Sequence, residues 1–218
     1  MANNGQKETK ELILDAAEKL FAKQGFDATS LRQITSAAGV NLAAVNYHFG
    51  SKEALIDAVI FRRLEPLNRE RLDLLDRLEN EAGEQGPALE KIVAAFIGPP
   101  LRMQQTAGSE GANFMRLIGR VMSDPSDRLL AQFINQLREV IERFSAAFGR
   151  ALPDLSAADL LWRMIFMVGS MAHTMSISSH LPKATGGLCD PSDAGALIKM
   201  MTPFLAAGMR AGAKGGDA

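Results

Sequence analysis

A run of four polar or aromatic residues, Asn46-Tyr47-His48-Phe49, ends a short alanine-rich segment whose spacing predicts a helix over 42–49. An asparagine amide can pair with N6 and N7 of adenine in the major groove of B-DNA, and leucine or alanine can contact the thymine methyl group. Tyrosine and histidine side chains, and Lys52 beyond Gly50, can reach backbone phosphates. These side chains together indicate a surface that reads a nucleic acid.

Residues for catalysis or metal binding do not converge in the sequence. The histidines are His48, His173 and His180, and the single cysteine, Cys189, has no histidine near it along the chain. No CxxC or HxxxH spacing for zinc is present, and the Gly-Gly pair at 186–187 lacks the Lys-Ser/Thr of a phosphate-binding loop. We therefore predict no catalytic residue, no metal ligand and no cofactor, in a protein that is not an enzyme.

Length and composition set further bounds. The 218 residues fit one large domain or two small ones, and 47% of them are apolar. Basic residues number 24 and acidic residues 25, so a nucleic-acid reader must concentrate its positive charge locally. The polar N-terminal segment carries no secretory apolar core, and no run approaches the ~18 unbroken apolar residues of a membrane span. We expect a cytoplasmic protein without membrane contact.

The apolar spacing is helical almost everywhere, with no period-two alternation, so the predicted fold class is all-α with about nine helices. Proline should kink or end the helix near Pro66, and Gly98-Pro99-Pro100 should stop another. The polar stretch 79–86 predicts a linker. The predicted helices span 9–24, 30–38, 42–49, 51–64 with more helix to about 78, 87–97, 113–122, 124–148, 157–178 and 191–209.

The first three helices form a helix-turn-helix pattern, in which Gly39 makes the tight turn between the second and the third. Apolar residues at the spacing of a small core alternate here with outward positions. The outward or helix-start residues that we predict to contact DNA are Thr29, Ser30, Asn41, Leu42, Ala43, Ala44, Asn46, Tyr47, His48 and Lys52. From spacing alone, a helical interaction protein that does not bind DNA remains the alternative.

Residues 13–59, "ILDAAEKLFAKQGFDATSLRQITSAAGVNLAAVNYHFGSKEALIDAV", resemble the DNA-binding domain of TetR-type transcriptional regulators over their whole length. The resemblance rests on the AA..LF...G...TS start, the I...AGV turn, the Y-H-F ending and the SKEAL restart. It implies a DNA-binding domain over 7–67 and an all-helical ligand-binding and dimerisation domain over 84–210. Thr35, Asn41 and Ala43 depart from the residues common in the family, which should change the operator that is read.

Two later segments, "LLWRMIFMVGSMAHTMS" and "MMTPFLAAGMRA", are similar to the C-terminal regions of PsrA-like regulators, which respond to long-chain fatty acids. With the TetR-type pattern, we therefore predict a repressor that binds a palindromic operator on double-stranded DNA as a homodimer and is released by a hydrophobic small molecule, a fatty acid or an acyl-CoA. The residues predicted to line the ligand pocket are Phe114, Arg116, Leu117, Ile118, Phe133, Leu137, Trp162, Phe166 and His173.

Several of these assignments have a plain structural alternative. A methionine and aromatic stripe at helical spacing also suits ordinary core. Arg116, Arg120 and Arg163 are candidate anchors for an acidic head group, but each could equally be a solvated or ion-paired surface residue. The two last long helices carry more apolar residues than one subunit can bury. Small residues that permit close helix approach predict the dimer interface there: Gly169, Ala172, Ala206 and Ala207.

Overall fold

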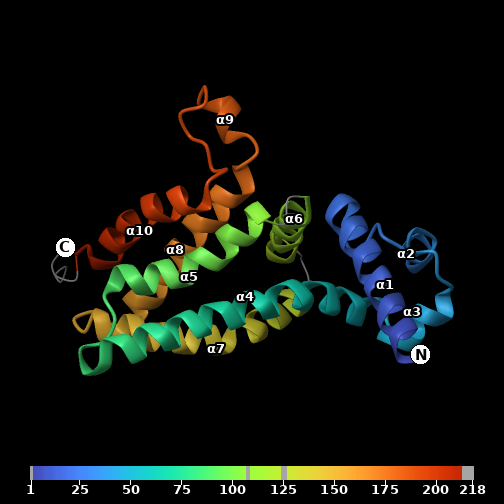
Figure 1. The fold of residues 1–218 in the computed structure, drawn as a ribbon, viewed down its shortest axis with the longest axis horizontal. Coiled ribbons are helices and arrows are strands. Elements are labelled where there is room, and N and C mark those ends of the chain that lie inside the picture. The colour runs from blue at the N-terminus through green and yellow to red at the C-terminus, as the bar shows by residue number, and fades with distance from the viewer. Residues whose placement is uncertain (1, 107–108, 124–126, 213–218) are drawn as a thin grey trace. The chain divides into compact units, whose positions relative to one another are not determined.

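The computed structural model describes residues 2–106, 109–123 and 127–212, and within these ranges the fold is all-α, as predicted. Ten α-helices and one short 3-10 helix follow one another in the described ranges (Figure 1). They are α1 (Ala2–Gln24), α2 (Leu31–Ala38), α3 (Leu42–Phe49), α4 (Lys52–Ala82), η1 (Gly83–Gln85), α5 (Leu89–Thr106), α6 (Ser109–Ser123), α7 (Asp127–Ala151), α8 (Ala157–Ile177), α9 (Leu181–Ala184) and α10 (Ala194–Arg210).

The helices form two compact units that are interleaved along the chain. Unit 1 comprises the residues up to Pro66 together with Ala112–Gln136, and unit 2 comprises Leu67–Gly111 with the residues from Leu137 onward. The predicted domains, 7–67 and 84–210, are contiguous segments, so they do not anticipate that most of α6 and the start of α7 belong with α1–α3. Helix α4 is continuous and contributes residues to both units.

In unit 1 the core lies under α1, where Ile13, Ala17 and Phe21 are fully buried at helical spacing. Helix α1 begins at Ala2, before the predicted Thr9, because Thr9 does not cap it. Its hydroxyl instead donates to the carbonyl oxygen of Gly5, 2.8 Å away, within the helix.

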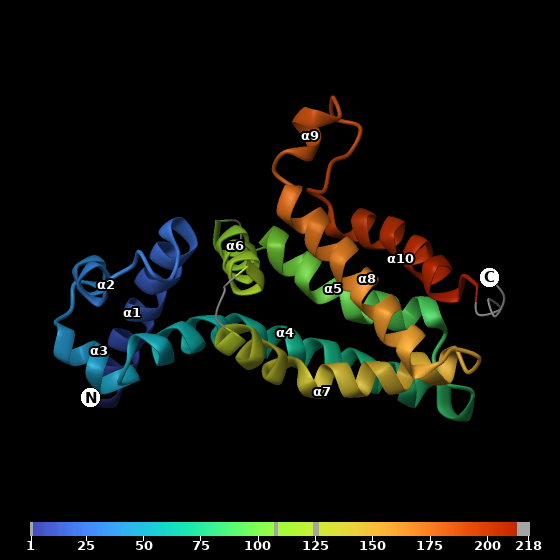
Figure 2. The ribbon, with the colours of Figure 1, turned by 180° about the vertical axis from the view of Figure 1, so that it is seen from behind.

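In unit 2 the helices α5, α8 and α10 lie side by side in both views (Figures 1 and 2). The inner side of α8 is lined by methionines spaced three or four residues apart, Met164, Met167, Met171 and Met175, all buried. The short α9 lies at the tip of a segment that projects from the ends of α8 and α10 (Figure 2). Helix α10 begins at Ala194, where the Asp193 carboxylate accepts the Ala196 N–H at 3.0 Å, so the predicted start at Asp190-Pro191 was wrong.

Two predicted helix ends were also wrong, the first of them at Pro66, where the sequence predicted a kink or an end. Helix α4 passes through Pro66 and continues to Ala82, across part of the predicted linker. The polar residues at its end are held by long-range ion pairs, since Glu79 binds both Arg143 and Arg150 of α7. Sequence spacing alone could not reveal these partners, which lie 64 and 71 positions away along the chain.

The second wrong prediction concerns Gly98-Pro99-Pro100, which lie buried within α5. Pro100 has no N–H, so the helix cannot satisfy the carbonyl oxygen of Phe96 four residues earlier. Arg71 of α4 replaces the missing donor: its Nε lies 2.9 Å from that oxygen, and its guanidinium carbon lies 4.6 Å from the centroid of the Phe96 ring. The helix therefore continues because a side chain from another helix completes its hydrogen bonding.

Arg71 is only 5% exposed. Burial lowers its pKa to about 10, which still leaves the guanidinium charged at neutral pH. A second hydrogen bond runs from its Nη1 to Asn68 Oδ1 at 3.4 Å. A charged group this deeply buried is stable only if its donors are satisfied. Arg71 and the proline-containing turn of α5 therefore stabilise each other.

We expect R71M to lower the free energy of unfolding by about 1–3 kcal/mol, because it leaves the Phe96 carbonyl without a donor. P100A returns an N–H to the helix at that position. In urea unfolding, the double variant R71M/P100A should therefore lose less stability than the sum of the single variants, with a coupling of roughly 1 kcal/mol. R77M, at an exposed arginine of the same helix, is the matched control and should change little. Strictly additive single effects would contradict this pairing.

Candidate nucleic-acid interface

The turn between α2 and α3 is closed by its own side chains and glycines. Ser30 caps α2: its hydroxyl accepts the Gln33 N–H at 3.2 Å, and Gln33 Oε1 accepts the Ser30 N–H at 2.8 Å. Gly39 ends α2 at φ +69°, a left-handed conformation that favours glycine. The chain then enters α3 after two residues, as the sequence predicted.

Helix α3 presents one buried side and one open side. Val45 is fully buried, whereas Leu42, Ala43, Asn46 and Tyr47 are exposed, with Tyr47 at 72%. Asn41 caps the helix, because its Oδ1 accepts the Ala44 N–H at 2.9 Å. This oxygen is therefore occupied, and only the Asn41 amide nitrogen remains free to donate to a base or phosphate. Bidentate pairing with adenine needs both the oxygen and the nitrogen of an amide, and the Asn46 side chain is exposed.

The other predicted DNA contacts divide by exposure. Ser30 is exposed, and Ala44, His48 and Lys52 are half-buried. Thr29 is fully buried, and its hydroxyl donates to the Gly25 carbonyl oxygen at 2.7 Å. Thr29 was thus predicted as a contact but holds the turn before α2 instead. The methyl and hydroxyl of threonine suit that interior position, which spacing alone could not distinguish from an exposed helix start.

A buried carboxylate, Glu18, joins α1 to α4. Glu18, 2% exposed, accepts from Arg62 Nη2 at 2.5 Å and from Arg63 Nε at 3.1 Å. Arg62 also pairs with Glu11 and Asp15. Burial by itself would lower the pKa of Arg62, but the hydrogen bonds to these three carboxylates raise it, so it stays charged. The network holds α1 against α4, and α1 also packs against α2 and α3.

Helix α6 also contacts the module formed by α1, α2 and α3, which we call the reading module, within unit 1. Arg120 Nη2 lies 3.4 Å from the Ala22 carbonyl oxygen and 3.3 Å from that of Lys23, so it caps the C-terminal end of α1. In α7, Arg128 pairs with Asp57 of α4 at 3.0 Å. Arg120 had been considered as an anchor for an acidic head group, and no signal in its own helix pointed to α1.

The predicted pocket residues are divided between the two units. Phe114, Leu117 and Phe133 are buried in unit 1, where Ile118 is half-buried and Arg116 is exposed. The rest belong to unit 2: Leu137 is half-buried on α7, and Trp162, Phe166 and His173 are exposed on α8. Arg163, also considered as an anchor, donates from Nη1 to the Met209 carbonyl oxygen at 2.6 Å, near the end of α10.

The small residues predicted for the dimer interface differ in exposure. Gly169 and Ala207 are exposed and Ala172 is half-buried, but Ala206 is fully buried in the subunit. Among the described helices, α8 is long and apolar enough to cross a membrane by length and composition alone. One side of α8 is buried in unit 2 and the other side is exposed. No group of three histidine, cysteine, aspartate or glutamate residues that could hold a metal occurs in the described part of the chain.

A capped turn, a buried anchor residue and an open row of amide, phenol and small apolar side chains define a helix-turn-helix protein. Residues 13–59 match the family described as bacterial regulatory proteins, tetR family, and residues 94–208 match the tetracyclin repressor-like C-terminal domain. The chain belongs to the TetR family of transcriptional regulators, which are not enzymes.

Related proteins support this membership. The chain is 32% identical over 130 residues to the HTH-type transcriptional regulator SrpR of Pseudomonas putida, covering 60% of this chain and 59% of that protein. It is 32% identical over 124 residues to the uncharacterized HTH-type transcriptional regulator TtgW of Pseudomonas putida, covering 57% of this chain and 90% of TtgW. The aligned part thus spans less than two thirds of SrpR.

Solved structures share the fold at lower identity. A TetR family transcription regulator from Marinobacter aquaeolei VT8 has a TM-score of 0.66 at 16% identity, covering 95% of this chain and 98% of that one. The fatty acid degradation regulator FadR from Bacillus halodurans has a TM-score of 0.62 at 18% identity, covering 93% and 96%. Both similarities concern the fold alone.

We expect N41A to lower the free energy of unfolding by about 1 kcal/mol, because α3 loses its cap. N41S keeps a side-chain oxygen for the Ala44 N–H and should stay within about 0.5 kcal/mol of the parent. Urea unfolding of the full chain measures both. If N41A and N41S were equally stable, the capping role of Asn41 would be excluded.

Proposed function

We propose that this protein is a one-component repressor that binds a palindromic DNA operator as a homodimer. The observation that supports the proposal is the open side of α3, where Asn46 and Tyr47 are exposed in a module whose helix ends are capped from within. Because the caps are satisfied inside the protein, these side chains are free for a partner. Among the described interactions, the Asn46 side-chain amide has no hydrogen bond.

Each exposed side chain has a role in this proposal. Asn46 pairs with an adenine, and Leu42 and Ala43 contact thymine methyl groups. Tyr47, His48, Lys52 and Ser30 bind phosphates, with Ser30 at the start of α2, where a helix N-terminus favours an anion. Lys52 already lies near this turn, with its Nζ 3.4 Å from the Asp27 carbonyl oxygen. Phosphate contacts position the module, and the three α3 side chains specify the sequence.

The homodimer rests on the outer sides of α8 and α10. Seven of the fourteen exposed large apolar side chains of the described chain lie on these two helices: Leu161, Trp162, Ile165, Phe166, Val168, Met200 and Phe204. We call them the α8–α10 face. Helix α8 is therefore apolar on both sides, with methionines inside and an aromatic pair outside. An apolar area of this extent on a soluble chain marks a protein contact, and a second copy is the partner that a palindromic operator requires.

In this proposal Trp162, Phe166, Gly169, Ala172 and Ala207 belong to the dimer contact. Trp162 and Phe166 are 59% and 63% exposed, and their rings stack with centroids 5.9 Å apart. They thus leave the predicted ligand pocket. Ala206 leaves the dimer contact because its own subunit buries it completely.

A hydrophobic effector, a fatty acid or an acyl-CoA, is proposed to bind inside unit 2 and release the DNA. The buried methionines of α8 are flexible and polarizable, so α5, α8 and α10 can separate around an alkyl chain at low cost. Binding of the alkyl chain is stabilised by about 25 cal/mol per Å² of apolar surface removed from water. The similarity of fold to FadR of Bacillus halodurans, a fatty acid degradation regulator, is consistent with this class of effector.

Helix α4 is proposed to carry the effect, since its continuous backbone contributes to both units. To turn mostly bound DNA into mostly free DNA, the effector must favour the released state by ~5 kcal/mol. A protein with this mechanism acts in the cytoplasm, where its operator lies. The alternative, a helical interaction protein that does not bind DNA, predicts weak binding without sequence preference.

Enrichment of a random DNA library on the full chain tests the function. We expect a palindrome whose half-site centres lie about 34–36 Å apart, with affinity that falls steeply as salt rises. N46A should relax the preference at one base pair by about 1–3 kcal/mol. Y47A should instead weaken binding to all DNA sequences equally. Q132A, at an exposed glutamine of α7, is the control. If no sequence is enriched at low salt, the interaction-protein alternative holds.

The same operator tests the effector. Palmitate or palmitoyl-CoA should release the bound chain, as measured by fluorescence anisotropy, and hexadecanol of equal chain length separates the effect of the acidic head group from that of the alkyl chain. Sequence-specific binding that none of these three alters would exclude this effector class but not the regulator.

For the dimer, analytical ultracentrifugation of F166D should show a dissociation constant raised at least ten-fold, about 1.4 kcal/mol, because a carboxylate would be buried at the interface. L188D is the matched control, since Leu188 is 90% exposed on the α9 segment, outside the α8–α10 face. A parent chain that sediments as a monomer, or an F166D dimer as tight as the parent, would contradict the proposed interface.

A further inference from the structure

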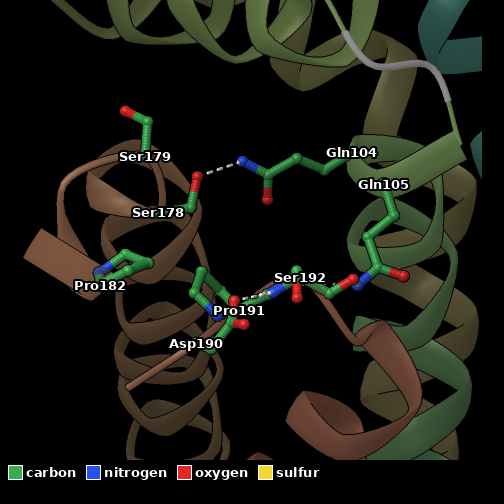
Figure 3. A pocket seen from close by; sticks show the side chains of 8 residues that line it. All are labelled: Gln104, Gln105, Ser178, Ser179, Pro182, Asp190, Pro191 and Ser192. Carbon is green, nitrogen blue, oxygen red and sulfur yellow. Dashed lines mark hydrogen bonds between the residues drawn. The ribbon is translucent and has the colours of Figure 1, made fainter. Parts of the chain in front are cut away.

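Unit 2 contains an open pocket of about 350 Å³, lined mostly by polar residues, at the place where α5 and α8 both end (Figure 3). Its walls come from the last turn of α5, from the residues after α8, and from the segment that leads to α10. Gln104, Gln105, Ser178 and Asp190 line it together with neighbouring serines and prolines. None of these residues belongs to the DNA-reading module or to the α8–α10 face.

The two glutamine amides point their nitrogens into the wall. Gln104 Nε2 donates to the Met175 carbonyl oxygen and to Ser178 Oγ, each at 2.8 Å. Gln105 Nε2 donates to the carbonyl oxygens of Pro191, at 3.3 Å, and of Ser192. An amide held in this way offers only its oxygen to a ligand. Figure 3 shows the Gln104 oxygen directed into the open space between the two sides of the pocket.

Charge in the pocket is negative. Among the described lining residues Asp190 is the only one that ionises. One of its oxygens accepts the Ser192 N–H at 2.9 Å, and a carboxylate has further acceptor positions for another donor. Hydrogen bonds from Ser192 lower the pKa of the Asp190 carboxyl, so it is ionised at neutral pH. Lys183 is close along the chain but does not line the pocket.

The helix ends add to this negative field. Helix α5 ends at Thr106 and α8 at Ile177, and both C-termini carry the partial negative charge of a helix dipole. The positive N-terminus of α10 also lies near, but the Asp193 carboxylate already caps it. A carboxylate or phosphate would therefore meet repulsion here, whereas a cation would be favoured.

We propose that this pocket binds a small organic cation, an alkylammonium, whose N–H groups donate to Gln104 Oε1 and Asp190. The apolar part of the ligand lies against Pro182 and Pro191, the two prolines of the lining. Ser178 and Ser192 hydroxyls can turn to accept or donate and so adapt to the ligand. The site is distinct from the methionine-lined interior proposed for the acidic effector, and it stands whether or not the chain binds DNA.

The test uses hexylammonium, hexanol and hexanoate, which share one alkyl chain and differ in the head group. Each is titrated into the ¹⁵N-labelled full chain without DNA, and the side-chain amide signals of Gln104 and Gln105 are followed by NMR. We expect hexylammonium to shift both signals with a dissociation constant of ~1 mM, as is reasonable for so small a ligand. Hexanol should bind about five-fold more weakly and hexanoate should leave both signals unmoved.

The variant D190N removes the charge but keeps an oxygen for the Ser192 N–H, so the turn should persist. We expect it to weaken hexylammonium about five-fold and to leave hexanol unchanged. D154N is the matched control, because Asp154 is exposed before the other end of α8, a helix of 21 residues and thus about 30 Å long. Equal binding of hexanoate, an unchanged affinity in D190N, or shifts that avoid both glutamines would each overturn the proposal.

Discussion

A polar backbone group inside a protein must find a hydrogen-bond partner, and in this chain that requirement at helix ends organises both units. In the reading module, Ser30, Gln33 and Asn41 close the starts of α2 and α3, and Gly39 lets the chain turn between them. These local contacts leave the outer side chains of α3 without a task inside the protein. The exposed row of Asn46 and Tyr47 is a consequence of caps that are satisfied by their neighbours.

Arginines meet the same requirement over long distances. Arg120 reaches the last carbonyls of α1, Arg163 reaches α10, and Arg71 replaces the N–H that Pro100 lacks. A guanidinium suits this task, because it stays charged when buried and carries several donors in a fixed plane. Each of these bonds joins two helices, so local backbone needs become tertiary contacts. Helix α4 contributes residues to both units, and it takes part in these contacts through Arg71 and, in the Glu18 network, through Arg62 and Arg63.

Helix α8 shows why a family of regulators needs more than a reading head. Its methionines are buried, while Trp162 and Phe166 are exposed. One subunit covers only the inner side, and in the proposed dimer a second copy would cover the outer side. The buried methionines and the exposed aromatic pair thus place the proposed effector site and the proposed dimer contact on opposite sides of the same helix. The polar pocket at the end of α8 has the opposite chemistry, since its field favours cations.

The sequence by itself determined the all-α class and the first three helices, because helical spacing, capping residues and glycine turns act within a few residues of one another. Asn46 and Tyr47 were expected outside, and both are exposed. Only the tertiary structure decided the burial of Thr29, the outward side of Trp162 and the passage of α5 through its prolines. The carbonyl oxygens that Arg71 and Arg120 reach lie 25 and 98 positions away along the chain. No local pattern encodes which distant carbonyl an arginine will reach, and there the sequence alone was silent.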